Sequence, residues 1–327
     1  MRKAPIADTI SRVIGRNLAL KHVLTLLKDL SRPDLATRGL SFCLGVVCLL
    51  LSVTATPVFS EEKIPLDEIR IKTPHYVADQ ESFHPSLGVY EYKTSWQGIG
   101  AATLKVYVDQ VEDYYHIVAT AKTNKFVDLF YRLRYQALGV ISTNQFTPIN
   151  TSIQQQENSK VKQTQINYLP DGRVLSVNWR KGKDVEQIEF DPKNEMLEPF
   201  AAAFLARSLD WPKGTVRRFD TFDGKNRYLL KLSSVDEIEM KINGEPRKVW
   251  VISPYVKKLA TNKKHDKLRE ARIYVTADEQ REVLQIVSEV FVGSVKTQLV
   301  SFTPKERYLA GSSIAWQLEQ QADTALH

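Results

Sequence analysis

Apolar and polar residues alternate with a period of two along most of the chain from residue 88 to about residue 303. Such alternation is typical of antiparallel strands that bury one face. Residues 101–109 illustrate it, with one apolar face made of Ala102, Leu104, Val106 and Val108. The longest such run occupies the even positions from Tyr228 to Ile242. A strand of that length has to curve, so a bulge is expected at residues 234–236.

Dipeptides that tolerate a positive φ separate several of these runs. Asp171-Gly172, Asp223-Gly224 and Asn243-Gly244 each lie between two strand patterns and predict two-residue hairpin turns. For the strand after the first dipeptide, the pattern predicts an inward-facing set of Leu175, Val177 and Trp179. The count of such runs predicts about twelve to fourteen strands.

One segment, at about residues 195–210, has a helical pattern instead. Pro199 suits the first helical position, and Phe200 and Phe204 fall four residues apart on one face. Arg207 complements the C-terminal end of the helix, and a proline and a glycine follow it. The chain is therefore expected to be mainly β: a curved antiparallel sheet or incomplete barrel, with this helix packed on its concave side.

The N-terminus has the pattern of a targeting segment. Residues 39–60 carry no charge, and eight Lys or Arg residues against three Asp precede them. A positive flank before an apolar run predicts export, with a cleaved signal peptide in residues 1–60. The alternative is a retained signal anchor helix in the inner membrane, because the uncharged run reaches the roughly 20 residues that a membrane span needs. Both alternatives predict a periplasmic location for the remainder.

The charge balance changes once the leader is set aside. The whole chain has a net charge of +7, but residues 61–327 carry 37 cations against 35 anions, a net charge of +2. This near-neutral remainder argues against a nucleic-acid partner. Both cysteines, Cys43 and Cys48, also lie in the leader, so disulfides and thiolate chemistry are not expected after it.

The chain is expected to divide into four segments. Residues 1–60 form the leader, and residues 61–87 form a linker or an arm because they contain three prolines and little periodicity. Residues 88–303 form a single β-rich domain, and residues 304–327 form a polar tail.

No catalytic constellation is recognisable after the leader. The histidines stand apart from one another, at His75, His84, His116, His265 and His327. Their spacing does not fit a metal site, and no glycine-rich loop opens a helix to hold a phosphate. We therefore expect no metal, no cofactor and no enzymatic activity. A hydrolase of envelope polymers that uses carboxylates remains a lesser alternative.

Clustered aromatic residues are the candidates for binding an apolar ligand. They are Tyr90, Trp96, Phe126, Phe130, Tyr131, Phe200 and Phe204. In the stretch from residue 123 to residue 136, the spacing of Phe126 and Phe130 indicates a helical turn, and the alternation that follows indicates a strand. This turn-to-strand junction is expected at one end of the sheet, with Phe126 and Phe130 at the mouth of a groove. Burial in an ordinary core is the competing interpretation for each of these aromatic residues.

A basic segment at residues 256–272 is the second candidate surface. Its cations include Lys257, Lys258, Lys263, Lys264, Lys267 and Arg269. One interpretation is a solvated extension of a hairpin. The alternative is contact with an anionic membrane surface, where each well-placed cation would contribute about 1 kcal/mol of binding free energy.

Several segments together resemble a family of bacterial exported proteins, domain of unknown function family 3108. They include "KTNKFVDLFYRLR", "PFAAAFLARSL" and "RIYVTADEQREVLQIVSEVFVGSV". The resemblance covers about residues 82–302, with departures at Ser86-Leu87 and at Leu284. It implies a periplasmic β-rich domain and supplies no catalytic residues. By analogy of fold alone, such a domain is similar to the half-barrels that carry lipids or lipoproteins between bacterial membranes.

The sequence therefore predicts a non-catalytic protein of the cell envelope that binds a lipid-like ligand in a groove of the curved sheet. The alternative is an interaction or scaffold protein that docks another envelope protein through its sheet edges or its basic segment.

Overall fold

The computed structural model of this protein describes residues 64–242, 244–259, 270–289 and 293–306. The expected leader, residues 260–269 of the basic segment and nearly all of the polar tail lie outside these residues. Within the described part, fifteen strands form one sheet that accompanies a single α-helix, α3 (Pro199–Ser208), and a short 3-10 helix, η1 (Val127–Leu129). The mainly β architecture expected from the sequence is confirmed, with one more strand than the highest count predicted.

The strands follow one another closely along the chain. Their bounds are β1 (Gly88–Trp96), β2 (Ile99–Val111), β3 (Tyr114–Thr123), β4 (Leu133–Ser142), β5 (Pro148–Glu157), β6 (Lys160–Tyr168), β7 (Val174–Arg180), β8 (Glu186–Phe190), β9 (Met196–Leu197), β10 (Val216–Phe222), β11 (Arg227–Ile242), β12 (Glu245–Lys258), β13 (Glu270–Thr276), β14 (Val283–Glu289) and β15 (Ser294–Pro304).

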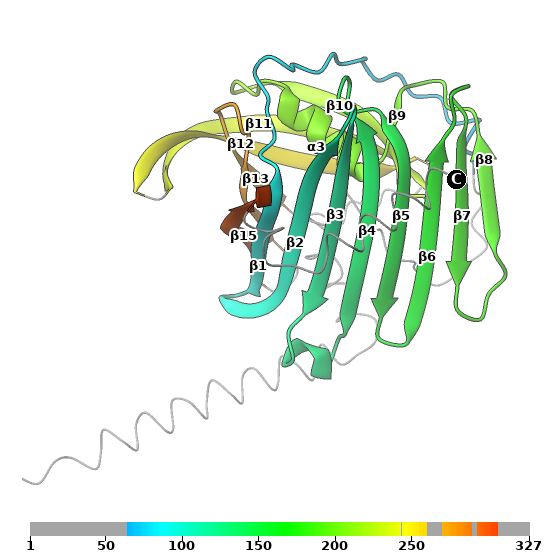
Figure 1. Ribbon diagram of the computed structural model, residues 1–327, viewed down its shortest axis with the longest axis horizontal. Coiled ribbons are helices and arrows are strands. Elements are labelled where there is room, and N and C mark those ends of the chain that lie inside the picture. The colour runs from blue at the N-terminus through cyan, green and yellow to red at the C-terminus, as the bar shows by residue number, and fades with distance from the viewer. Residues whose placement is uncertain (1–63, 243, 260–269, 290–292, 307–327) are drawn as a thin grey trace, which may run out of the picture.

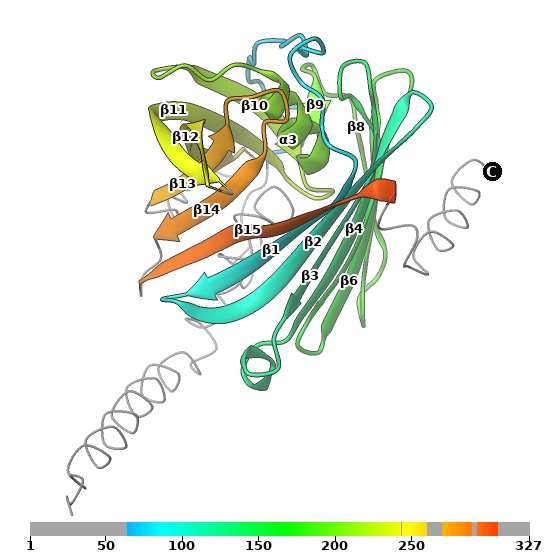
Figure 2. The same cartoon turned by 60° about the vertical axis from the view of Figure 1, so that its left-hand side comes forward.

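The order of strands in the sheet is β8-β7-β6-β5-β4-β3-β2-β1-β15-β14-β13-β12-β11-β10-β9. Two runs of hairpins are therefore joined where β1 pairs with β15, as Figures 1 and 2 show. Every pairing is antiparallel except that of β10 with β9. Hairpins need only short connections, which explains why so many strands fit into this length of chain.

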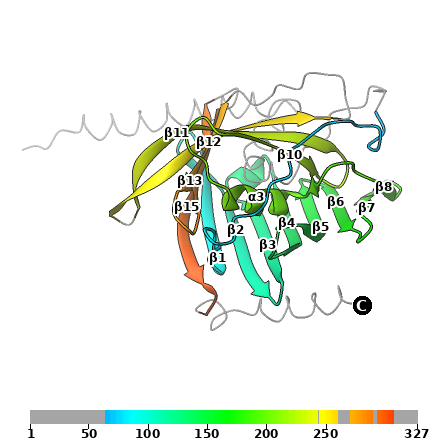
Figure 3. The same cartoon turned by 90° about the horizontal axis from the view of Figure 1, so that it is seen from above.

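Curvature of the sheet places α3 on its concave side. Seen from above, α3 lies between β10–β12 on one side and β2–β5 on the other (Figure 3). The predicted irregularity in the longest strand is present, because the register of β11 against β12 shifts between Ser234 and Asp236. Up to this shift, the even positions of β11 face the core, with Leu230 and Leu232 both buried.

The inward face of β7 differs from the expectation. Val174, Ser176 and Asn178 are buried, whereas Trp179, expected inside, is exposed. The polar side chains face inward because the β10–β11 turn reaches across to them: Ser176 Oγ and Asn178 Nδ2 donate hydrogen bonds to Gly224 O at 2.6 and 2.7 Å. Polar side chains can be buried when they have hydrogen-bond acceptors. The alternation of apolar residues therefore predicted the wrong inward face for this strand.

The predicted two-residue turns fit only one hairpin. Two residues separate β11 from β12, but residues 169–173 separate β6 from β7, and residues 223–226 separate β10 from β11. In the last of these loops, Gly224 has a φ of +90°, and a Cβ atom there would lie 2.2 Å from Thr164 Cγ2. Glycine is therefore required at this position both for its backbone conformation and for the close approach to β6.

Residues 64–87 form an arm that crosses the end of the sheet at which α3 lies (Figure 1). A buried ion pair, Arg227 Nη2 to Asp220 Oδ2 at 2.5 Å, anchors its first part, because Arg227 Nη1 also donates to Leu66 O at 2.6 Å. Further along the arm, Phe83 is buried in the core, with its ring centre 6.3 Å from that of Phe204. The arm thus contributes both polar and apolar contacts to the domain.

None of the helices formed by the described residues has the length and apolar character needed to cross a membrane.

Candidate functional site

The helix α3 begins with a buried carboxyl group. Glu198 is fully buried, and its side chain accepts hydrogen bonds from Phe200 N at 2.8 Å and Ala201 N at 2.6 Å. These bonds cap the first turn, where backbone N–H groups lack helical partners. Burial nevertheless raises the pKa of Glu198 to about 7, although the capping bonds oppose this shift. The helix therefore starts on a titratable group inside the core.

A glycine in β4 lets α3 approach the sheet closely. A Cβ atom on Gly139 would lie 2.4 Å from Phe200 Cδ2, which is far closer than van der Waals contact. The alanines that follow Phe200 present little bulk, and Ala201 and Ala202 are completely buried. Small residues on both elements thus bring the helix backbone down toward the inner face of the sheet.

Two arginines hold the C-terminal end of α3 against the loop between β13 and β14. Arg207 donates from Nε to Arg281 O at 2.8 Å and from Nη2 to Gln280 O at 2.9 Å. Arg281 in return donates to Leu209 O at 2.8 Å and pairs with Asp210 at 3.0 Å. The carbonyl of Leu209, at the end of the helix, gains a donor in this way. The helix is therefore fixed at both ends.

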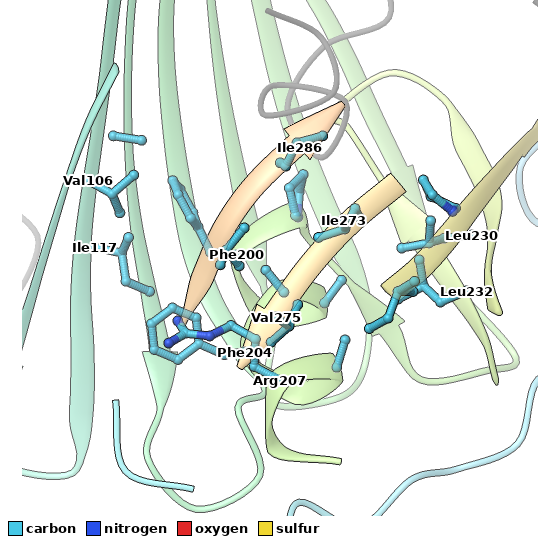
Figure 4. A pocket seen from close by; sticks show the side chains of 18 of the residues that line it. Val106, Ile117, Phe200, Phe204, Arg207, Leu230, Leu232, Ile273, Val275 and Ile286 are labelled. Atoms are coloured by element: carbon cyan, nitrogen blue, oxygen red, sulfur yellow. The ribbon is translucent and has the colours of Figure 1, made fainter. Parts of the chain in front are cut away.

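An apolar cavity of about 200 Å³ lies between α3 and the concave face of the sheet (Figure 4). The residues that line it come from α3 and the segment after it, from β1–β3 and from β11–β14. They are Tyr90, Tyr92, Leu104, Val106, Val108, Ile117, Ala119, Pro199, Phe200, Ala202, Ala203, Phe204, Ala206, Arg207, Trp211, Leu230, Leu232, Ile252, Pro254, Val256, Ile273, Val275, Val283 and Ile286. For comparison, a cavity of about 150 Å³ in another protein stays dry and admits benzene.

One end of the cavity is more polar than the rest. The Arg207 guanidinium group lies over the rings of Phe83 and Phe204, with its Cζ atom 5.0 and 5.5 Å from the ring centres. Figure 4 shows it beside Phe204, away from Ile286 and Leu230. Burial raises the pKa of Tyr90 and Tyr92, and the Arg207 charge acts on both in the opposite direction. The cavity therefore has a cationic end and a hydrocarbon end.

The cavity also reaches a gap in the sheet. Among the described residues, the ladder between β12 and β13 ends at Ile252 and Ile273, although β12 continues to Lys258 and β13 begins at Glu270. Pro254, just beyond the last pair, has no N–H group to donate to a neighbouring strand. Pro254 and Ile273 both line the cavity, so its wall includes the two sides of this gap.

Comparison with known proteins identifies the family of this chain. The family model of DUF3108, described as a protein of unknown function, matches residues 89–300. The chain belongs to this family. The resemblance noted from the sequence is thereby confirmed, and the matched residues include α3 and all of the lining of the cavity. No curated protein matches the chain.

Two solved structures are similar to the fold of this DUF3108 protein. One is a β-barrel-like protein of DUF1849 from Brucella abortus, with 8% identity, a TM-score of 0.47, and coverage of 68% of this chain and 100% of that chain. The other is a candidate lipoprotein from Parabacteroides distasonis, with 9% identity, a TM-score of 0.27, and coverage of 70% and 100%. Both TM-scores are below 0.5, so neither structure indicates what the cavity holds.

The structure brings some of the predicted ligand-binding residues together. Tyr90, Phe200 and Phe204 line the cavity. Tyr131 is buried in the core but does not line it. Trp96 lies at the end of β1, after a register shift between Thr94 and Ser95, and is also outside the lining.

Phe126 and Phe130 lie at the other end of the strands. They flank η1 in the β3–β4 loop, which is at the opposite end of these strands from α3 in Figures 1 and 2. Their rings are 5.9 Å apart, and their exposed fractions are 47% and 49%. Asp128, between them, forms an ion pair with Arg134 at 2.5 Å. The hydrogen bonds that Arg134 donates to it lower the pKa of Asp128 to about 2. The predicted turn-to-strand junction exists, but it is not at the mouth of the cavity.

Of the predicted surface-binding cations, Lys257 and Lys258 are described and lie at the end of β12. Lys263, Lys264, Lys267 and Arg269 fall outside the described residues.

Sequence reasoning missed the polar end of the cavity. The sequence indicates only that Arg207 is a cation at a helix end and that Phe83 belongs to an arm of little periodicity. A signal for the apolar wall does exist in the sequence, because the even positions from Tyr228 to Ile242 form one face of the predicted strand. Among the described residues, no group of three or more His, Cys, Asp or Glu side chains is placed to hold a metal ion.

Proposed function

We propose that this protein is an exported, non-catalytic component of the bacterial cell envelope, which holds an acyl chain in the cavity between α3 and the concave sheet. The observation that carries the proposal is the cavity itself, whose walls are almost entirely aliphatic and aromatic. The basic flank and the uncharged run at residues 39–60 support export.

An empty apolar cavity is energetically unfavourable. Side chains that face a void lose dispersion contacts on that side, and water gains few hydrogen bonds from aliphatic walls. A hydrocarbon chain restores those contacts and leaves water at the same time. Each methylene group that is fully buried contributes about 0.8 kcal/mol. The cavity is therefore suited to a flexible chain of several methylene groups.

The gap between β12 and β13 supplies an entry route. A chain that passes next to Pro254, beyond the last pair of Ile252 with Ile273, would enter the lining without separation of paired strands. This route also lets a ligand keep part of its structure outside the cavity.

The experiment begins with neutral chains, so that it tests the apolar cavity alone. We expect the full chain to bind dodecanol, and we expect affinity to rise roughly tenfold for each two-carbon extension from octanol until the cavity is full. Equilibrium dialysis measures this series. Organic extraction of the purified protein, followed by mass spectrometry, should also release an acyl-chain compound.

A matched pair of substitutions locates the site. Ala203→Phe fills the cavity from α3, whereas Thr120→Phe adds the same ring to an exposed position on β3. We expect the first variant to lose dodecanol binding and the second to retain it, at similar urea midpoints. Absence of dodecanol binding to the unmodified chain would contradict the proposal, as would undiminished binding by Ala203→Phe.

A further inference from the structure

Arg207 is the only charged residue among the described residues that line the cavity. Its guanidinium group is always protonated at physiological pH. Two of its nitrogens, Nε and Nη2, donate to the backbone carbonyls of Arg281 and Gln280. Within the described part of the chain, no carboxylate forms an ion pair with Arg207, whose remaining polar neighbour is the hydroxyl group of Tyr90. At the cavity, Arg207 is therefore a cation without a direct carboxylate partner among the described residues, and its Nη1 atom retains an N–H group to donate.

The acidic groups near this end of the cavity pair with Arg247, which Asp278 and Glu282 share, and not with Arg207. The charge of Glu282 acts on Tyr90 and Tyr92, as that of Arg207 does, so it lies in the same region. Its carboxylate, however, pairs with Arg247 Nη1 at 3.3 Å. Arg207 is half-buried, and a carboxylate that reaches it from the cavity would add a charge-assisted hydrogen bond beside the rings of Phe83 and Phe204.

A second donor lies at the same end of the cavity. The hydroxyl group of Tyr90 donates to Ser86 O at 3.0 Å, whereas that of Tyr92 makes no hydrogen bond to any described residue. Tyr92 lines the cavity and is buried, with an exposed fraction of 9%. Its oxygen is not among the fully enclosed polar atoms that lack a partner, so a ligand in the cavity can reach the hydroxyl group and accept a hydrogen bond from it.

We infer that the ligand is an amphiphile with a single carboxylate, which binds Arg207 Nη1 and the Tyr92 hydroxyl while its hydrocarbon chain lies toward Leu230, Leu232 and Val256. This inference rests on the proposed function and specifies its ligand. One negative charge balances the single cation of the lining, and two carboxylate oxygens match the donors of Arg207 and Tyr92. A phosphate monoester would bring a third terminal oxygen and close to two charges, for which the lining offers no further cation.

The test compares ligands that share a chain and differ in their head group. The full chain is dialysed at about pH 7 against radiolabelled dodecanoate, dodecanol and dodecyltrimethylammonium. Dodecanoate should bind about tenfold or more tighter than dodecanol, as charge-assisted hydrogen bonds imply, and the ammonium compound should bind least. Equal affinity for dodecanoate and dodecanol would overturn the inference and leave the proposed function intact. If none of the three binds, the proposed function fails, and the inference fails with it.

Substitutions then assign the head group to its site. Arg207→Met should remove the preference for dodecanoate while dodecanol binding persists. Arg132→Met, at an exposed position in the β3–β4 loop, should leave the preference for dodecanoate unchanged. Because Arg207 also holds α3 to the β13–β14 loop, the urea midpoint of each variant is measured in parallel. Tyr92→Phe leaves that contact intact and should reduce the preference several-fold. A carboxylate preference that survives in both Arg207→Met and Tyr92→Phe would overturn the inference.

Discussion

Two pairs of phenylalanines with the same spacing have opposite surroundings in this protein. Phe200 and Phe204 lie on α3 and are nearly completely buried against the sheet, whereas Phe126 and Phe130 flank η1 and are about half exposed. Each pair accompanies an acidic residue, Glu198 in the first case and Asp128 in the second. Spacing alone therefore identifies a turn of helix but does not determine what covers it.

The two carboxyl groups show how different the surroundings are. Burial raises the pKa of Glu198 to about 7, whereas the hydrogen bonds from Arg134 lower that of Asp128 to about 2. One group is favoured in its neutral form and the other in its charged form, because only the second has a cation beside it and solvent within reach.

The largest expected effect comes from truncating the buried pair. Phe204→Ala should lower the free energy of unfolding by about 3–5 kcal/mol, because it enlarges a cavity among Phe83, Phe146 and Tyr115, which contact the Phe204 ring. Urea unfolding followed by circular dichroism measures the change. A loss below about 1 kcal/mol would mean that α3 is not fixed by this contact.

An intermediate effect is expected from Glu198, at the start of α3, on the pH dependence of the free energy of unfolding. The raised pKa of Glu198 means that the folded protein holds a proton more tightly than the unfolded chain between about pH 4.5 and pH 7. The stabilisation is complete below this window and is lost as pH rises through it. Relative to Glu198→Gln, the unmodified protein should lose up to about 1.4 kcal/mol per pH unit there.

Asp128→Asn is the matched comparison for this experiment. The lowered pKa of Asp128 makes stability depend on pH in the opposite direction to Glu198. Its stabilisation is present above about pH 4 and is lost as pH falls through about 2. Since the pair with Arg134 lies near the surface, its contribution should not exceed about 1 kcal/mol. If both variants changed in the same direction with pH, the contrast between the two carboxyl groups would be wrong.

The smallest effect is expected at the exposed pair. Truncating both Phe126 and Phe130 to alanine should change the free energy of unfolding by no more than about 0.5 kcal/mol, because about half of their surface already meets water. Dodecanol binding should not change either, since both residues lie outside the cavity. A clear loss of dodecanol binding in the dialysis assay would mean that the β3–β4 loop contributes to the ligand site.

The sequence by itself determined the class of fold and many of its local features. Alternation identified the strands, proline and alanine identified α3, and the even positions of β11 identified one wall of the cavity together with its bulge at Ser234. These features depend on interactions between near neighbours in the chain, which leave a periodic record in the sequence.

Only the tertiary structure decided which residues meet across the sheet. The inward orientation of Ser176 and Asn178 depends on the Gly224 carbonyl, 46–48 residues away, and Phe83 reaches Phe204 from the arm. Likewise, the sequence around Arg207 indicates only a cation at a helix end, and the folded sheet places this residue in the lining of the cavity. Such contacts join residues that are distant in sequence, so no local period records them, and the cavity they form appears only when the chain is folded.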